Sequence, residues 1–236
     1  MGEEEGRGRT AVVTGGTGGL GRGVTGALRD GGYRTVVTWV LEREAEAARE
    51  AFGDSVELER LDVDDPVAVG MLAERLNGEG GAWAVAHLVG GFLADRPVAE
   101  MTREEWDHQM ALNARTLQTV LRAFLPGMIA RGGGRVVAVG TRAALTPFAG
   151  GAAYAASKAA VIALVRAASE EAKHDGVGVN CILPSVIDTP ANRAAMPDAD
   201  HARWVAPADI GAVVRFLCSD ASRAVTGAAI PVFGRA

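Results

Sequence analysis

The sequence predicts a doubly wound α/β domain, with a mostly parallel seven-stranded sheet covered by helices on both faces. Short, nearly continuous apolar runs alternate along the chain with longer helix-forming stretches, which is typical of buried parallel strands and their connecting helices. A glycine-rich turn directly follows the first apolar run. At 236 residues the chain is long enough for one such domain, and no linker or repeat divides it.

The first unit is a strand at Thr10–Thr14, a turn at Gly15–Gly21 and a helix from about Leu20 to Asp30. Glycines allow the backbone to approach a phosphate closely, and the helix N-terminus offers free N–H groups and a positive dipole. This order of strand, turn and helix therefore predicts a nucleotide site. A plain tight turn is the alternative reading.

The later elements follow from apolar runs and from helix start and stop signals. Pro66 suits the first position of a helix, Thr102 and Glu105 form a capping box, and Pro126 is expected to kink or break its helix. The expected strands are 34–39, 56–61, 82–89, 135–139, 177–183 and 228–233; the expected helices are 42–51, 66–76, 102–131, 151–173 and 207–219.

Two segments are expected to lie outside this regular pattern. Residues 1–9 are polar and acidic and predict a flexible N-terminal tail, which leaves 10–236 as the single domain. Residues 188–205 are turn-rich and form a candidate lid over the substrate. An ordered surface loop with a short helix is the alternative for this second segment.

Composition excludes several classes of function. The net charge is −5 and the basic residues are scattered, so no basic stripe predicts nucleic acid or a membrane surface. The first residues lack a signal peptide's apolar centre, and we expect a cytoplasmic protein. The apolar surroundings of Cys181 and Cys218 predict core thiols, and no metal site is expected.

Tyr154 and Lys158 are four residues apart on an alanine-rich helix and therefore share one face. A neighbouring ammonium favours the phenolate, and it can bring the pKa of a tyrosine down from about 10 towards neutral pH. The pair is a candidate acid/base. Two exposed side chains on an amphipathic helix are the alternative.

Together these patterns resemble the short-chain dehydrogenase/reductase family in its single-domain form, over about residues 10–234. The resemblance rests on Thr14-Gly-Gly-Thr-Gly-Gly-Leu-Gly21, on Asp62-Val63, on Asn113, and on Tyr154 with Lys158. At the C-terminus, Val232-Phe-Gly234 departs from the family pattern of an acidic residue and two glycines, and three further positions also depart. Thr141 replaces the usual Ser, His87 stands where Asn is common, and Ser185 follows Pro184 in place of Gly.

The resemblance implies a Rossmann-type oxidoreductase that moves a hydride between a nicotinamide cofactor and a carbonyl/alcohol substrate. Its implied catalytic residues are Asn113, Thr141, Tyr154 and Lys158, with Tyr154 as the general acid/base. Lys158 is expected to hold the nicotinamide ribose and to lower the Tyr154 pKa. His87 is interpreted as a structural histidine at a strand end.

The implied cofactor residues are Gly15, Thr17, Gly19, Leu20, Gly21, Trp39, Arg43, Asp62, Val63, Val89, Gly90, Tyr154, Lys158, Pro184, Val186 and Thr189. NAD-preferring members carry an acid at the end of the second strand. Here Trp39 takes that place, which favours NADP over NAD, with Arg43 near enough to serve a 2′-phosphate and Glu42 a hydroxyl.

The expected substrate-binding residues are Phe92, Thr141, Phe148, Tyr154 and Ser185, with Leu93, Thr146 and Val186 beside them. This mostly apolar set predicts a neutral ketone or alcohol, unless Arg142 or Arg193 points inward. A non-catalytic NAD(P)-binding regulator is the alternative function. An epimerase or dehydratase would need a larger C-terminal part. The resemblance also implies a homodimer or homotetramer.

Overall fold

The predicted doubly wound fold is confirmed by a seven-stranded parallel sheet with the order β3-β2-β1-β4-β5-β6-β7. The computed structural model describes residues 5–93 and 96–235. The strands are β1 (Thr10–Thr14), β2 (Arg34–Trp39), β3 (Glu57–Arg60), β4 (Ala82–His87), β5 (Gly134–Val139), β6 (Val177–Pro184) and β7 (Ala229–Val232). Strand β3 ends one residue before the predicted position. Strand β4 ends at His87, two residues before the predicted position, so Val89, Gly90 and Gly91 follow the strand at the edge of the sheet.

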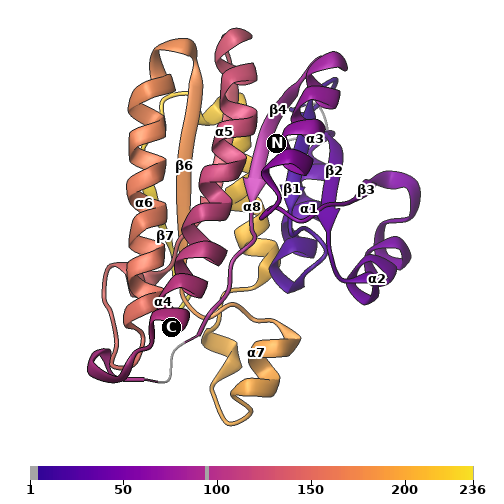
Figure 1. Cartoon of the computed structure of the whole chain (residues 1–236). Coiled ribbons are helices and arrows are strands. Elements are labelled where there is room, and N and C mark those ends of the chain that lie inside the picture. Colours follow the sequence, from indigo (N-terminus) through magenta and orange to yellow (C-terminus); the bar gives the residue numbers. More distant parts are fainter. Residues whose placement is uncertain (1–4, 94–95, 236) are drawn as a thin grey trace.

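Helices cover both faces of the sheet (Figure 1). One apolar core cluster includes residues of α3 (Pro66–Gly78), α5 (Thr116–Ala130) and α6 (Ala152–Ala172). The other face holds α1 (Gly19–Asp30), α2 (Glu42–Phe52) and α8 (Pro207–Cys218). Two short helices, α4 (Arg103–Gln109) and α7 (Pro190–Ala195), lie near the carboxyl ends of the strands, where α7 projects from the body of the domain (Figure 1).

The predicted helix over 102–131 is interrupted by a π-helical turn, Met110–Arg115, between α4 and α5. The expected capping box at Thr102 and Glu105 is present. Pro126 lies inside α5 without ending it, so the predicted break at this residue is wrong. The irregularity falls instead around Asn113, where side-chain bonds to neighbouring segments compete with regular helical winding.

The described part of the N-terminus is packed against the domain, although the sequence predicts a flexible tail over residues 1–9. The backbone N–H of Gly6 donates to Gly31 O at 2.9 Å. Arg9 pairs with Asp220 at 2.9 Å, and its guanidinium lies 3.7 Å from the centre of the Trp83 ring. Residues 5–9 therefore belong to the domain, and residues 1–4 lie outside the described chain.

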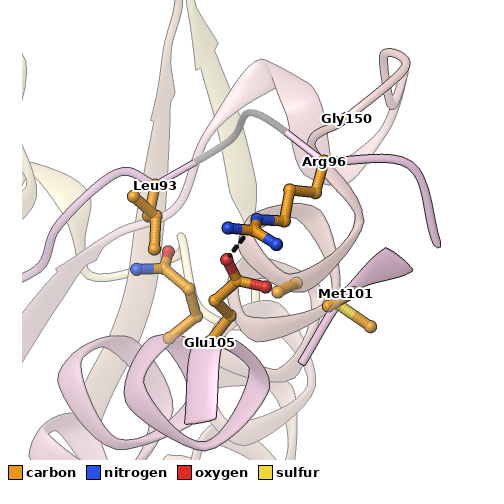
Figure 2. Close-up of a pocket in the computed structure, with 7 residues that line it drawn as sticks. Leu93, Arg96, Met101, Glu105 and Gly150 are labelled. Atoms are coloured by element: carbon orange, nitrogen blue, oxygen red, sulfur yellow. Dashed lines mark ion pairs between the residues drawn. The ribbon is translucent and has the colours of Figure 1, made fainter. Parts of the chain in front are cut away.

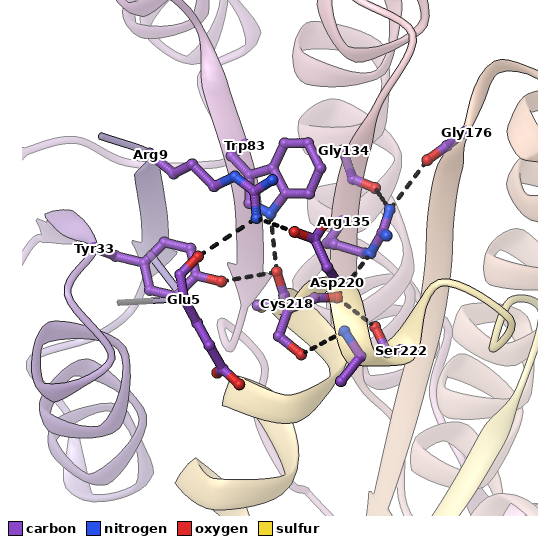
Figure 3. A network of polar contacts seen from close by, with 12 residues as sticks. Glu5, Arg9, Tyr33, Trp83, Gly134, Arg135, Gly176, Cys218, Asp220 and Ser222 are labelled. Atoms are coloured by element: carbon purple, nitrogen blue, oxygen red, sulfur yellow. Dashed lines mark hydrogen bonds and ion pairs between the residues drawn. The ribbon is translucent and has the colours of Figure 1, made fainter. Parts of the chain in front are cut away.

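Polar groups at the amino ends of the strands meet the end of α8 (Figure 3). Arg135 is 5% exposed and donates to the carbonyl groups of Gly134, Gly176 and Ser219. Trp83 Nε1 and Tyr33 Oη each donate to Cys218 O at 2.9 Å. Burial raises the pKa of Tyr33, and so the phenol keeps the proton that this bond needs. The carbonyl groups that α8 leaves unpaired at its end are satisfied here.

The segment Ala152–Asp175 consists of α6 and the turn after it, and by length and composition alone it could cross a membrane. Half of its apolar 18-residue stretch is buried inside the domain. Its buried side chains pack in the same core as α5 and the sheet, so we assign it to the domain core. Cys181 and Cys218 are free and buried, which confirms the predicted core thiols.

Candidate active site

The site lies where the strand order reverses, between β1 and β4. Ligands of open parallel sheets bind in the crevice at this point. Gly15 has a φ of +69°, a conformation that favours glycine. A Cβ atom at Gly15 would lie 3.0 Å from Val89 Cγ2, so the turn after β1 runs closely along the end of β4.

The start of α1 lies close to the beginning of the glycine turn and to Thr189. A Cβ atom at Gly21 would lie only 2.3 Å from Gly15 O, and one at Gly19 would lie 2.9 Å from Thr189 Cγ2. No side chain caps α1 at Gly18, and its first turn has no acidic residue. The amides at this helix end suit an anion. This cradle fits the pyrophosphate of a dinucleotide, with Leu20 half-buried beside it.

The end expected to hold the adenosine has an unusual aromatic residue. Trp39 is 8% exposed, and within residues 5–93 and 96–235 its indole Nε1 is the only fully buried side-chain polar atom without a partner. The guanidinium groups of Arg49 and Arg60 lie 5.5 and 5.8 Å from its ring. Arg43 is exposed nearby along α2. Arg49 is also paired with Glu42 at 2.7 Å, so cationic and anionic side chains both stand at this corner.

The remaining expected cofactor residues lie on the turns that surround this crevice. Val63 is buried after β3, and the Asp62 carboxylate accepts from Asp64 N at 2.9 Å. Thr17 donates to Glu44 of α2 at 3.4 Å and ties the glycine turn to that helix. Pro184 ends β6, and Val186 and Thr189 follow it.

Three expected catalytic or cofactor residues meet at the end of β4. Lys158 Nζ donates to Val139 O at 2.8 Å and is 5% exposed. A Cβ atom at Gly90 would lie 2.6 Å from Asn113 Oδ1 and 2.8 Å from Lys158 Nζ. Gly90 therefore lies directly against both groups, and a larger residue would displace them.

The Asn113 side chain is held by backbone and side-chain bonds. Its Oδ1 accepts from Gly91 N at 3.0 Å, and its Nδ2 donates to Gly91 O at 3.1 Å and to Ser157 Oγ at 3.0 Å. Nδ2 also lies 3.4 Å from Gln109 Oε1. These bonds join the π-helical turn to the strand end after β4 and to α6, which carries Tyr154.

Tyr154 and Thr141 line the same pocket, and their side chains are near enough to interact. Burial raises the pKa of the phenol, and the interaction with Thr141 lowers it by less, so that the pKa is raised. The expected lowering of this pKa by Lys158 is not found: the ammonium is directed to Val139 O, and desolvation of the phenolate dominates. Burial also lowers the pKa of Lys158 to about 8.

His87 has the structural role that the sequence predicts. Its Nδ1 lies 2.8 Å from Thr14 Oγ1, and its Nε2 lies 3.3 Å from Thr116 Oγ1. Because Thr116 donates its own proton to Leu112 O, its oxygen accepts from Nε2–H and Nδ1 accepts from Thr14. Burial first, and then the charge of Lys158, lower the pKa of His87 to about 3, so the ring is neutral.

A pocket of about 490 Å³ opens beside Tyr154 and Thr141. It is lined by Phe92, Thr141, Arg142, Ala143, Thr146, Phe148, Tyr154, Ser185, Val186, Ile187, Asn192 and Met196. All five substrate-binding residues predicted from the sequence are among them. Leu93 is not: it lines a separate cavity of about 20 Å³ with Arg96, Met101 and Glu105 (Figure 2).

The two arginines singled out from the sequence lie differently. Arg193 binds the Asp188 carboxylate within its own segment, with Nη2 2.7 Å from Oδ2. Arg142 lines the pocket, and its guanidinium lies 5.4 Å from the centre of the Phe233 ring. Its charge is therefore at the pocket wall, next to the C-terminal segment.

The candidate lid over residues 188–205 is closed at its base by backbone bonds. Asp188 N donates to Val205 O at 2.8 Å, and Val205 N donates to Val186 O at 3.1 Å. Thr189 caps α7 by accepting from Asn192 N. The segment is an ordered loop with a short helix that contributes Asn192 and Met196 to the pocket, and its movement as a lid stays a prediction.

Sequence reasoning missed Ser157 and Gln109, which hold Asn113. Both lie one helical turn from a predicted site residue, and that spacing was the available signal. Within residues 5–93 and 96–235, no group of three or more His, Cys, Asp or Glu side chains is placed to hold a metal ion.

Comparisons with known proteins agree with this geometry. Residues 15–234 match the family model described as Enoyl-(Acyl carrier protein) reductase. The 3-oxoacyl-[acyl-carrier-protein] reductase of Vibrio cholerae is 28% identical over 235 residues, which cover 96% of each chain. The 2,5-dichloro-2,5-cyclohexadiene-1,4-diol dehydrogenase of Sphingobium indicum is 28% identical over 240 residues, covering 96% of this chain and 95% of the relative.

A solved structure of levodione reductase superposes with a TM-score of 0.89 at 25% identity, over 97% of each chain. The match therefore extends over the sheet, both helical layers and the site. The chain belongs to the short-chain dehydrogenase/reductase family of nicotinamide-dependent oxidoreductases.

Proposed function

We propose that this protein interconverts a neutral carbonyl compound and its alcohol, with Tyr154 as the general acid/base. The observation that carries the proposal is that Tyr154 and Thr141 line one mostly apolar pocket with their side chains near enough to interact. The cofactor, when bound, supplies or accepts the hydride. The protein's own residues then position the reacting oxygen and move its proton.

In the direction of reduction, the Tyr154 hydroxyl donates its proton to the carbonyl oxygen. The raised pKa of the phenol keeps that proton in place until the oxygen becomes basic. Thr141 stands beside it and donates a hydrogen bond that stabilises the developing negative charge. Thr141 lines the same pocket as Tyr154, as this contact requires.

Lys158 and Asn113 act behind the phenol. The buried Lys158 ammonium would bind the hydroxyls of the nicotinamide ribose and hold the cofactor against Tyr154. With its pKa lowered to about 8, this amine can also give up and take back a proton near neutral pH. Asn113, fixed on Gly91 and Ser157, would hold a water that reprotonates Lys158.

We propose NADP as the preferred cofactor. Trp39 replaces the carboxylate that would accept a bond from the ribose 2′-hydroxyl. Arg43, Arg49 and Arg60 are the cations at this corner that a 2′-phosphate can use, and Arg49 is also paired with Glu42. Calorimetric titration of the apoprotein with 2′,5′-ADP and with 5′-ADP tests this. We expect tighter binding of the 2′-phosphorylated ligand; equal affinity would contradict the preference.

We also propose a homodimer or homotetramer, as the family resemblance implies. An apolar groove of about 410 Å³ between α5 and α6 supports it, with Leu121, Leu125, Ile129 and Leu164 among its lining residues. Light scattering after size exclusion measures the assembly. A monomer at micromolar concentration would contradict this part of the proposal. A cytoplasmic location, expected from the sequence, belongs to the same proposal.

Tyr154→Phe tests the central assignment. This variant keeps the ring packed against Phe92 but removes the proton that the mechanism transfers. We expect turnover to fall at least about 100-fold, while the affinity for NADPH stays within about twofold. Thermal unfolding controls for the fold. Retained turnover in Tyr154→Phe would refute Tyr154 as the acid/base.

A further inference from the structure

The wall of the pocket beside Tyr154 is aromatic. The Phe92 ring contacts the Tyr154 ring edge to face, with 4.9 Å between centroids and an interplanar angle of 86°. The Phe148 ring continues from Phe92 at 6.1 Å with a tilt of 37°. These three rings, which we call the aromatic wall, lead from the phenol towards the pocket mouth.

The two phenylalanines are built into the site from different segments. Phe92 follows β4, whereas Phe148 lies just before α6 and packs on Gly151. A Cβ atom at Gly151 would come within 2.7 Å of the Phe148 ring, so glycine at this position allows the ring to lie against the start of the Tyr154 helix. The position of Phe148 is therefore coupled to the helix that carries the reacting hydroxyl.

Both rings are exposed to a degree that is unusual for large apolar side chains. Phe92 is 63% and Phe148 is 46% exposed, and Met196 of the lid segment, which also lines the pocket, is 38% exposed. Exposed apolar side chains that gather around one cavity mark a surface that a ligand covers. Phe92, Phe148 and Met196 lie in three separate parts of the chain and are brought together only at this pocket.

The charged groups around the pocket already have partners. Arg193 is bound by Asp188, Arg96 on the segment after Phe92 pairs with Glu105 at 2.9 Å (Figure 2), and the Arg142 guanidinium lies over the Phe233 ring. An anionic substrate, or an acidic protein that carries a linear acyl chain, would have to separate Arg193 and Arg96 from their carboxylates to use these two cations, which leaves Arg142 as its one cation at the pocket wall among the charged groups described here.

We infer that the substrate is an uncharged compound with a rigid ring system whose carbonyl group reaches Tyr154 and whose ring face lies on Phe92 and Phe148. This inference rests on the proposed function and names the substrate class for the same site. An aromatic or alicyclic ring gains from offset stacking on the aromatic wall and covers its exposed area. A linear thioester offers no such face, and it brings a polar carrier to an apolar mouth.

The first experiment compares NADPH-dependent reduction of two ring ketones, 1-tetralone and camphorquinone, with a linear thioester, acetoacetyl pantetheine, and a keto acid, levulinate. We expect kcat/KM for a ring ketone to exceed that of the thioester and of the keto acid by at least about tenfold. A better thioester or keto acid would overturn the inference and leave the proposed oxidoreductase intact.

Variants then locate the preference. Phe148→Ala is expected to raise KM for the ring ketone by roughly tenfold with little change in kcat, since it removes one aromatic contact remote from the proton transfer. Phe148→Leu keeps an apolar side chain and should recover only part of this loss. Phe216→Ala is the matched control, because Phe216 is 36% exposed on α8 and does not line the pocket. An unchanged KM in Phe148→Ala would overturn the inference.

A binding measurement separates the two possible failures. If none of the four compounds is reduced while NADPH binds, the proposed carbonyl reduction fails for these compounds. The thermal shift caused by 1-tetralone in the presence of NADPH then decides the inference on its own. A shift that Phe148→Ala abolishes and Phe216→Ala preserves supports the aromatic wall as a ring-binding surface, whereas no shift, or an equal one in Phe148→Ala, overturns it.

Discussion

Gly90→Ala is expected to lower kcat by roughly 100-fold while it leaves the fold intact. The new Cβ atom would lie 2.6 Å from Asn113 Oδ1 and 2.8 Å from Lys158 Nζ, whereas ordinary contacts begin near 3.4 Å. Those two separations must therefore widen by about 0.8 and 0.6 Å. A displacement of about 1 Å at a reacting centre can cost two orders of magnitude in rate.

The same substitution should leave the protein folded. Gly90 is exposed and does not have a positive φ, so alanine fits its backbone conformation. We expect a loss of about 1–3 kcal/mol in the free energy of unfolding, because the new methyl group displaces two buried side chains. Gly78→Ala is the matched control, since a Cβ atom at Gly78 meets nothing within 4 Å.

Steady-state kinetics at saturating NADPH, with urea unfolding of both variants, provides the assay. Turnover in Gly90→Ala within threefold of the parent protein would refute the reasoning. It would mean that Asn113 and Lys158 either tolerate the displacement or do not limit the rate. A large loss of stability in Gly90→Ala would instead show that Gly90 supports the fold.

Three further outcomes are expected. Thr141→Val should lower kcat by roughly 100-fold and raise the pKa of Tyr154, which would shift the pH profile of alcohol oxidation to higher pH. Thr141→Ser should retain activity. Equal losses of activity in the two variants would refute the role of the hydroxyl. The pKa of His87 is about 3 in the folded protein and near 6.5 in the unfolded chain, so between pH 3 and 6.5 the unfolded chain binds more protons. The free energy of unfolding should therefore fall as the pH drops below about 6.5, by up to about 1.4 kcal/mol per pH unit. Urea unfolding at pH 7, 6 and 5 should show a weaker pH dependence of this free energy for His87→Asn than for the parent protein, and an equal dependence would contradict the argument. Arg135→Met should cost about 2–3 kcal/mol in urea unfolding, because buried carbonyl groups lose their donor, and a loss as small as in the exposed control Arg103→Met would contradict the network.

Local sequence signals predicted most of the fold. The strand, glycine turn and helix at residues 10–30 could be predicted because the residue types at these positions favour the conformations that they adopt. The same is true of Pro66 at a helix start and of the capping box at Thr102. Such features depend on neighbours within a few residues, which a single sequence displays directly.

Features that depend on distant partners were less predictable. The π-helical turn around Asn113 arises from bonds to Gly91 and Ser157, which lie 22 and 44 residues away in sequence. The direction of the Lys158 ammonium towards Val139 O likewise depends on packing between α6 and β5. For this reason the sequence predicted Lys158 and Tyr154 on one face of their helix but predicted the wrong direction for the Tyr154 pKa.

The π-helical turn at Met110–Arg115 determines what the loss of one residue from this part of the chain would do. A π-helical turn holds one residue more than an α-helical turn. A chain with one residue fewer here would wind into a single regular helix, with the apolar sides of α4 and α5 still on their present neighbours. Only the segment around Asn113 would retract from Gly91 and Ser157. The proposed catalytic role of Asn113 therefore depends on the length of this one turn.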